Sequence, residues 1–249
     1  MQYYGNSLKI DGGKYYGMQT EDISSKSMGI ITANVQSVII EDGEFVGYTG
    51  FGAINSTNSL IINGGSFIGI HSGAQILSKN AQINGGYFES SWHGGLYIAS
   101  ETAHIKNTTS ALKKYSELKA STLFDEYYSQ YLPDAFVTPD GNLYAALYIG
   151  GNKDYVSNIY MDNCKIIWKK YNENARDTSI VMNMGYNNFN QNLYISNMDI
   201  QGDIRVDCGY TDGIQASLYI GKNVSYNNIV GTPNIGFVDT TTFINESFE

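Results

Sequence analysis

The chain has 249 residues, enough for one domain with a full hydrophobic core or for two small ones. It carries 24 acidic and 15 basic residues, a formal net charge of −9, and only two arginines, Arg176 and Arg205. Phosphate binding needs clustered cations, so this balance argues against a nucleic-acid partner, and it would also repel an acidic polymer such as pectate. No apolar stretch approaches the roughly 20 residues that span a bilayer. We therefore expect no membrane insertion, and the chain as given shows no signal peptide.

One short phrase recurs along the chain, beginning near residue 10. Copies such as "IINGGSFIG" and "QINGGYFES" align on an aliphatic anchor residue. The anchors are Ile10, Ile40, Ile62, Ile83, Ile105, Met161, Ile195 and Ile220. The fifth residues after them form a second column, large and apolar in six of eight copies: Tyr15, Phe45, Phe67, Phe88, Ser110, Ile166, Ile200 and Ser225. A third column lies upstream of the anchors: Ile31, Ile54, Ile76, Ile98 and Ile149.

Short runs with period-two alternation, rich in Ile, Val, Tyr and Phe, are typical of β-strands. Three such strands per repeat, with like residues stacked over like, predict a parallel β-helix whose turns are about 4.8 Å apart. We expect an all-β, single domain over residues 1–249 with about eight turns. Its corners need positive φ, which suits Gly-Gly or Asp-Gly and, at the neighbouring position, Asn107, Asn163 and Asn197. The Tyr-rich opening "MQYYG" and the irregular closing "TPNIGFVDTTTFINESFE" are expected to cap the ends.

Two histidines follow consecutive copies of the phrase. His71 and His93 occupy the same place in neighbouring turns, and Thr49 occupies that place one turn earlier. Tyr48, Ile70 and Trp92 then belong to the adjoining column. Two imidazoles with a threonine as the third ligand make a poor metal site, so no metal and no cofactor is expected.

A sugar suits this surface better than a metal ion. Aromatic faces pack against pyranose rings while imidazoles form hydrogen bonds. The predicted ligand-binding residues are Tyr48, His71, Trp92 and His93. The alternative interpretation is that Trp92 is a corner residue that shields the core.

The repeat is interrupted between the fifth and sixth anchors by an inserted segment, residues 108–144. From about residue 110 to 132 its apolar residues recur every three or four positions, and Pro133 ends the run, which predicts an amphipathic α-helix. We expect this helix to lie on the side of the coil. It either covers apolar surface, or forms a wall of a binding groove or a contact with another chain.

Carboxylates are densest in "DIQGDIRVDCGYTDG", which begins at Asp199. The weak catalytic candidates are Asp199, Asp203, Asp207 and Arg205. If alternate residues point inward, the last three share the outer face, and Asp203 and Asp207 would be about 13 Å apart. Glycosidase carboxylates lie about 5–9.5 Å apart, so a solvated ion-pair row centred on Arg205 is the other interpretation. The two cysteines, Cys164 and Cys208, are predicted to be buried thiols.

Repeats of the form "LIINGGSF" and "IYMDNCKII" resemble those of the right-handed parallel β-helix superfamily of pectate lyases, polygalacturonases and phage tailspikes. The resemblance covers nearly the whole chain outside residues 108–144 and implies a right-handed coil. "WHGG" at residues 92–95 and "HIK" at residues 104–106 are only partial echoes of polygalacturonase motifs, and adjacent aspartates are absent. Pectate-lyase-like enzymes need calcium-binding carboxylates with an Arg or Lys base near them, and Arg205 is the only arginine in a regular repeat. The signatures of the known enzymes are therefore absent. Tailspike-like proteins are commonly trimeric, so a homo-oligomer stays open, although no heptad segment is visible.

Two classes of function follow from these residues and this resemblance. We expect a non-enzymatic recognition or structural protein of a virion or a cell surface, tailspike-like or adhesin-like, whose side wall binds a glycan. The alternative is an extracellular polysaccharide-degrading enzyme, a lyase or a glycoside hydrolase. A structural spacer without a ligand also stays open.

Overall fold

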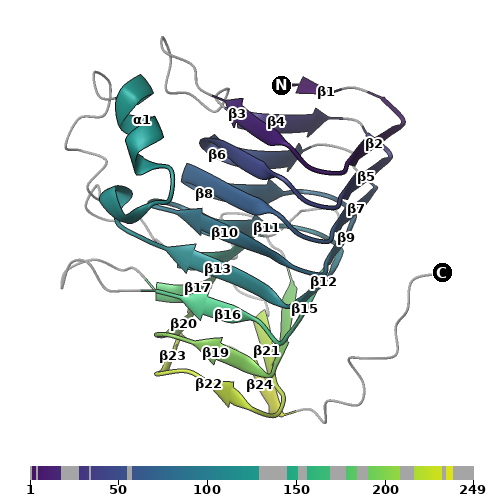
Figure 1. Ribbon diagram of the computed structural model, residues 1–249. Coiled ribbons are helices and arrows are strands. Elements are labelled where there is room, and N and C mark those ends of the chain that lie inside the picture. The colour runs from purple at the N-terminus through teal and green to yellow at the C-terminus, as the bar shows by residue number, and fades with distance from the viewer. Residues whose placement is uncertain are drawn as a thin grey trace.

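The computed structural model describes residues 2–3, 5–17, 28–33, 35–54, 58–128, 145–150, 156–168, 178–183, 190–207, 216–231 and 234–237. Most of these residues lie in strands of two sheets, and the paired strands run parallel. The chain advances along one direction, from β2 and β3 at one end to β22 and β24 at the other (Figure 1). The predicted all-β class with repeated parallel strands is therefore confirmed.

Nine strands form one sheet, and they carry the predicted anchors in register. They are β2 (Ser7–Ile10), β5 (Ser37–Ile40), β7 (Ser59–Ile62), β9 (Asn80–Ile83), β12 (Thr102–Lys106), β15 (Ser157–Asp162), β18 (Gln191–Ser196), β21 (Ala216–Ile220) and β24 (Asn234–Phe237). Each anchor from Ile10 to Ile220 pairs with the next. Phe237 extends this column, so the sheet has nine strands where about eight turns were expected. The closing segment is thus not irregular throughout, because residues 234–237 pair with β21.

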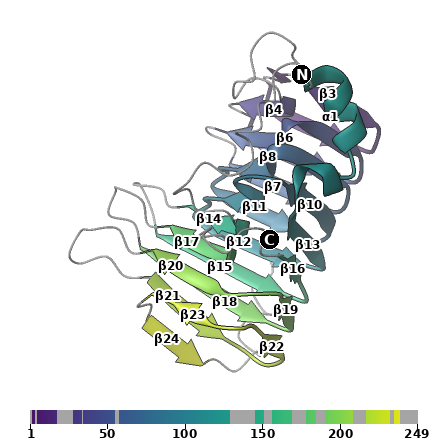
Figure 2. The ribbon, with the colours of Figure 1, turned by 90° about the vertical axis from the view of Figure 1, so that its left-hand side faces the viewer.

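The longer sheet has fifteen strands and bends around the core. Two of its strands are eleven residues long and belong to both of its sides, β6 (Glu44–Ile54) and β8 (Ser66–Ile76). The first side also contains β3 (Lys14–Gly17), β10 (Gly86–Ser90), β13 (Thr108–Leu112), β16 (Lys165–Ile167), β19 (Met198–Ile200) and β22 (Val224–Ser225). The second side also contains β1 (Gln2–Tyr3), β4 (Met28–Ala33), β11 (Gly94–Ile98), β14 (Ala145–Ile149), β17 (Thr178–Asn183), β20 (Ile204–Asp207) and β23 (Ile229–Val230). Successive repeats therefore add one strand to each of three faces around one core (Figure 2).

A column of stacked rings fills the core behind the first side. Phe67 is fully buried between Phe45 and Phe88, with ring centroids 4.8 and 4.6 Å away and nearly parallel planes. Tyr15 continues the stack 5.0 Å from Phe45. The predicted column continues in register through Ser110, Ile166 and Ile200. One residue recurring once per repeat thus becomes a continuous apolar column, as the sequence predicted.

The last position of this column was predicted one residue too early. Ser225 lies opposite Asp199, so the neighbour of Ile200 is Tyr226, which packs against the core. The turn that leads into this strand has its positive-φ asparagine three residues after the anchor, whereas the preceding turn has it two residues after. The extra residue shifts the register by one.

The third predicted column is correct over its later part only. Ile76, Ile98 and Ile149 pair in succession. Ala53 lies opposite Ile76, so Ile54 was aligned one residue away from its true place, and Ile31 lies opposite Gly52. The cause is a register shift in the middle of β6, which the repeat pattern does not reveal.

The corners take the glycine and asparagine conformations that the sequence predicted. Gly13, Gly43, Gly65 and Gly86 have φ between 110° and 143°, and Asn107, Asn163, Asn197 and Asn223 have φ between 47° and 55°. At Gly65 an added Cβ would also lie 3.0 Å from a backbone oxygen. The asparagine side chains bond across turns: Asn163 Nδ2 donates to Asn107 Oδ1 at 2.7 Å. The corners are therefore set by both backbone conformation and a polar ladder.

The inserted segment is less helical than the sequence predicted. Thr108–Leu112 form β13, which pairs with β10 and β16, so the insertion begins after Leu112 rather than at residue 108. A 3₁₀-helix covers Tyr115–Glu117, and α1 covers Ser121–Tyr128. The α-helix predicted over residues 110–132 is therefore wrong for 110–120 and correct for 121–128. Strand pairing prevails over the helical spacing at 110–112, and residues 129–144 lie outside the described residues.

The described part of the insertion packs on the first side of the longer sheet, as expected (Figures 1 and 2). Its buried contacts with the strands form a second apolar cluster of Val46, Ile68, Ile70, Leu118, Ala120 and Phe124. The insertion thus covers apolar surface of β6 and β8. In the part of the chain that is described, no helix is long and apolar enough to cross a membrane.

Of the two cysteines, Cys164 is a buried free thiol, as predicted, and Cys208 lies outside the described residues. Burial raises the pKa of the Cys164 thiol to about 12, so it is an unreactive core residue at neutral pH.

Candidate functional site

The four residues predicted to contact a ligand lie together where the two sides of the longer sheet meet. Tyr48 belongs to β6, His71 to β8, and Trp92 and His93 to the connection between β10 and β11. His71 stacks between Tyr48 and His93, with ring centroids 5.3 and 4.9 Å away. Trp92 contacts His71 edge to face at 5.2 Å. We call these four residues the aromatic–imidazole cluster.

The assignment of residues to columns that led to this prediction is wrong for Thr49 and for Ile70. Tyr48, and not Thr49, stacks on His71, while Thr49 is buried opposite Ser72. Ile70, expected beside Tyr48 and Trp92, is buried in the apolar cluster under the insertion. The register shift between β6 and β8 explains both changes, because β8 has one residue more than β6 at this point.

Two tyrosines that the sequence did not single out extend the cluster. His93 lies 4.5 Å from the ring centroid of Tyr148, which stacks on Tyr97 at 5.0 Å. Both tyrosines stand in the same tripeptide, "LYI", in β11 and β14, and they pair directly. That repeated tripeptide is the signal that could have predicted the contact.

Burial determines the protonation states in the cluster. Burial, with a smaller contribution from the neighbouring imidazole of His93, lowers the pKa of His71 to about 4, and burial lowers the pKa of His93. Burial raises the pKa of Tyr48 to about 12. All three side chains are therefore neutral at pH 7, and the faces of His71 are covered on both sides by other rings. Among the described residues no group of three or more His, Cys, Asp or Glu could hold a metal ion.

The neutral histidines predict a pH dependence of stability. The pKa of His71 is near 4 in the folded state and about 6.5 in an unfolded chain, so the unfolded state binds more protons between these values. The free energy of unfolding should therefore fall as the pH is lowered through this window, by on the order of 2 kcal/mol from His71. Urea unfolding at pH 7 and at about pH 4.5 measures the change.

The matched variants for this test are His71→Phe and His104→Phe. The first keeps a stacking ring and removes the titrating group, so it should lose less stability than the wild type on acidification. The second removes an imidazole outside the cluster, one that stacks on Tyr160 at 4.7 Å, and serves as the comparison for the loss of a histidine elsewhere. An equal acid-induced loss in His71→Phe and in the wild type would show that His71 is not responsible.

The weak catalytic candidates do not form one constellation. Asp199 belongs to β19 on the first side of the sheet, whereas Arg205 and Asp207 belong to β20 on the second side. Asp203 stands in the turn between these strands and accepts a hydrogen bond from Asn228 Nδ2 at 3.0 Å. The residues on either side of Arg205 are buried, so Arg205 points away from the core, as predicted. The Asp207 side chain lies outside the description, and the ion-pair row around Arg205 stays a prediction.

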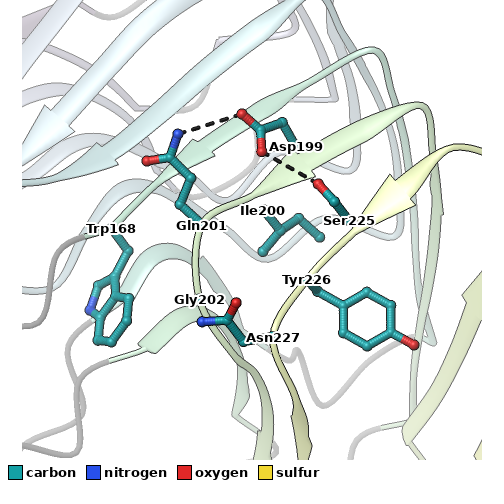
Figure 3. Close-up of a pocket in the computed structure, with 8 residues that line it drawn as sticks. All are labelled: Trp168, Asp199, Ile200, Gln201, Gly202, Ser225, Tyr226 and Asn227. Carbon is teal, nitrogen blue, oxygen red and sulfur yellow. Dashed lines mark hydrogen bonds between the residues drawn. The ribbon is translucent and has the colours of Figure 1, made fainter.

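An open pocket of about 470 Å³ lies beside Asp199 (Figure 3). Its lining residues are Trp168, Asp199, Ile200, Gln201, Gly202, Ser225, Tyr226 and Asn227. They come from three successive turns, since Trp168 follows β16, Gln201 follows β19 and Tyr226 follows β22. We call this feature the β19 pocket.

The shape of the β19 pocket depends on Gly202. Its φ is 133°, and an added Cβ would collide with the indole of Trp168 and with Ser179 Oγ. The absence of a side chain at Gly202 therefore lets the indole of Trp168 pack against the turn that carries Gly202. In Figure 3 the rings of Trp168 and Tyr226 stand on opposite sides of Gly202 and Asn227.

Polar groups complete the lining. Asp199 Oδ1 accepts from Ser225 Oγ at 3.4 Å, and Asp199 Oδ2 accepts from Gln201 Nε2 at 3.5 Å. The pocket thus combines two aromatic rings with carboxylate, amide and hydroxyl groups, a composition suited to a small polar ligand.

Sequence reasoning found one residue of the β19 pocket, Asp199, and missed the aromatic ones. Trp168 stands two residues after Ile166, as Gly202 stands two residues after Ile200. This equal spacing is the signal that could have placed both residues at the same corner. Tyr226 was missed because its column was aligned one residue too early.

Comparison with known proteins identifies no relative: no family model matches the chain, and neither a curated protein nor a solved structure does.

Proposed function

We propose that the chain is a right-handed parallel β-helix that acts as a recognition or structural protein of a virion or a cell surface. The handedness is supported by the general rule that crossovers between parallel strands of one sheet are right-handed in about 98% of cases. The recurrence of three parallel strands per repeat around a single core supports the coil. Stiff coils of this kind offer long side walls on which a binding site can be built.

The function we propose for the side wall is glycan binding, and the β19 pocket is the observation that carries it. Aromatic faces bind the C–H surface of a sugar, and surrounding polar groups bind its hydroxyls. Trp168 and Tyr226 supply the first kind of group, and Asp199, Gln201 and Asn227 supply the second. A volume of about 470 Å³ falls within the usual range of small-molecule sites.

The aromatic–imidazole cluster ranks second as a glycan site. Both faces of His71 are covered by other rings of the cluster, so a sugar would not stack on that imidazole. Trp92, like Trp168 and Tyr226, is half-buried and packs against the core, which for Trp92 also fits the interpretation that it shields the corner.

A polysaccharide-degrading enzyme fits the β19 pocket less well. Hydrolysis by most glycosidases needs two carboxyl groups about 5–9.5 Å apart. The described residues that line the pocket include one carboxylate, Asp199. We therefore propose recognition without catalysis.

Screening the wild type on a glycan array, followed by titration calorimetry with Trp168→Ala and Trp92→Ala, tests this proposal. Removing Trp168 should weaken binding about 10- to 100-fold, because it deletes one aromatic wall of the site. Trp92→Ala is the matched control and should bind like the wild type. Thermal melting of both variants confirms that the coil is folded.

Three results would contradict the proposal. The first is a wild type that binds no glycan on the array. The second is a Trp168→Ala variant with wild-type affinity. The third is loss of binding in Trp92→Ala alone, which would move the site to the aromatic–imidazole cluster.

A further inference from the structure

The carboxylate of Asp199 keeps much of its hydrogen-bonding capacity. Its contacts with Ser225 and Gln201 are 3.4 and 3.5 Å long, whereas strong bonds to a carboxylate measure about 2.5–2.9 Å. Its side chain is 55% exposed. An ionised carboxylate has two oxygens and accepts several bonds, so two neighbouring hydroxyl groups of a ligand can donate to it.

The charges at the β19 pocket disfavour an anionic ligand. Among the described residues that line it, none is Lys, Arg or His. The ammonium of Lys165 lies 3.8 Å from Asp199 Oδ2, half-exposed, and its charge is already opposed by that carboxylate. A sugar carboxylate in the pocket would approach Asp199 without a cation of its own, in a protein whose formal net charge is −9.

The two rings limit the size and shape of the ligand. Trp168 and Tyr226 stand on opposite sides of Gly202 and Asn227, which belong to successive turns (Figure 3). Gly202 leaves room for the indole of Trp168, which any larger residue at this position would displace. The pocket therefore presents two apolar walls and a polar rim to one small ring rather than a long groove to a polymer.

From these three observations we infer that the β19 pocket binds an uncharged pyranose and discriminates against sugars that carry a carboxylate. The rings bind the apolar faces of the sugar, and Asp199 accepts bonds from two of its hydroxyl groups. The inference rests on the proposed glycan-binding function and adds the class of sugar that the site selects.

The test measures dissociation constants for matched pairs of sugars that differ only in charge. Methyl glucoside and methyl glucuronide form one pair, and methyl galactoside and methyl galacturonide form another. The wild type should bind the neutral member about tenfold or more tightly. In Asp199→Asn the neutral sugars should bind more weakly and the preference should shrink towards one. Asp203→Asn removes a nearby negative charge outside the pocket and should keep the preference.

The outcomes separate this inference from the proposed function. If no sugar of either kind binds, the proposed function fails. If uronides bind as tightly as their neutral partners and Trp168→Ala weakens both, glycan binding stands and the charge selection is wrong. A preference unchanged in Asp199→Asn also overturns the role of that carboxylate.

Salt dependence gives a second measurement that needs no variant. Electrostatic exclusion is screened as ionic strength rises, so the neutral-to-acidic preference of the wild type should narrow between about 0.05 and 1 M salt. A preference that does not change with salt would overturn exclusion by charge.

Discussion

Replacing Phe67 by alanine should lower the free energy of unfolding by about 3–5 kcal/mol, because it opens a cavity in the middle of a packed column. The ring is fully buried and stacks on Phe45 at 4.8 Å and on Phe88 at 4.6 Å. Its neighbours cannot close the gap easily, since each is fixed at the spacing of the strands that carry it. Urea unfolding followed by circular dichroism measures the loss.

Phe237→Ala is the control for this variant. Phe237 occupies the last place of the anchor column and is 82% exposed, so its removal should change the free energy of unfolding by less than about 1 kcal/mol. Equal effects of the two substitutions, or a change below about 1 kcal/mol for Phe67→Ala, would show that the stacked column does not stabilise the coil.

Replacing Glu89 by alanine should cost about 3–5 kcal/mol of unfolding free energy, because it leaves buried partners without their acceptor. The Glu89 side chain is fully buried, and Lys113 Nζ lies 2.8 Å from its Oε2. Tyr87 donates its hydroxyl to the same oxygen at 2.7 Å, and the backbone N–H of Lys119 donates to Oε1 at 2.6 Å. Lys113 and Lys119 belong to the insertion, so Glu89 joins that segment to β10.

The hydrogen bonds of this contact favour the charged form of Lys113. Burial opposes the charged form of Lys113, but hydrogen bonds to Glu89 and Tyr87 outweigh it and raise the pKa of that ammonium. Lys119 Nζ also lies 3.7 Å from the centroid of the Tyr87 ring. Because the backbone N–H of Lys119 donates to Glu89, its hydrogen exchange should accelerate in Glu89→Ala. This acceleration reports release of the insertion as well as lower global stability.

Glu101→Ala is the matched control for the buried carboxylate. Its side chain is 40% exposed and lies 3.8 Å from Lys79, so its removal should cost under about 1 kcal/mol. If Glu89→Ala is no more destabilising than Glu101→Ala, Glu89 does not hold the insertion.

The repeat made most of the arrangement of parallel strands predictable from sequence. A strand exposes every second residue to the core, so a residue that recurs once per turn must stack on its equivalents. All eight anchors were placed in register for this reason. Errors arose where one residue is added within a turn or a strand, as before Tyr226 and between β6 and β8, because such an addition leaves the apolar pattern nearly unchanged.

The structure of the insertion and the composition of the β19 pocket could not be predicted from the apolar pattern of the sequence. An apolar residue that fits a helical spacing of three and four can also belong to a strand. Leu112 does so at the end of β13, where it packs in the core. The pocket depends on Trp168, Gly202 and Tyr226, which stand in three different turns. Their proximity follows from the register of the turns, and one misplaced residue in the last turn concealed it.

The two tryptophans allow the most direct measurement of the central claim, that the β19 pocket binds a sugar. Trp92→Phe leaves Trp168 as the single tryptophan, and Trp168→Phe leaves Trp92. Titration of each variant with methyl glucoside or methyl galactoside, followed by tryptophan fluorescence, should give a saturable change for Trp92→Phe and none for Trp168→Phe. A change in Trp168→Phe alone, or no change in either variant, would contradict the account.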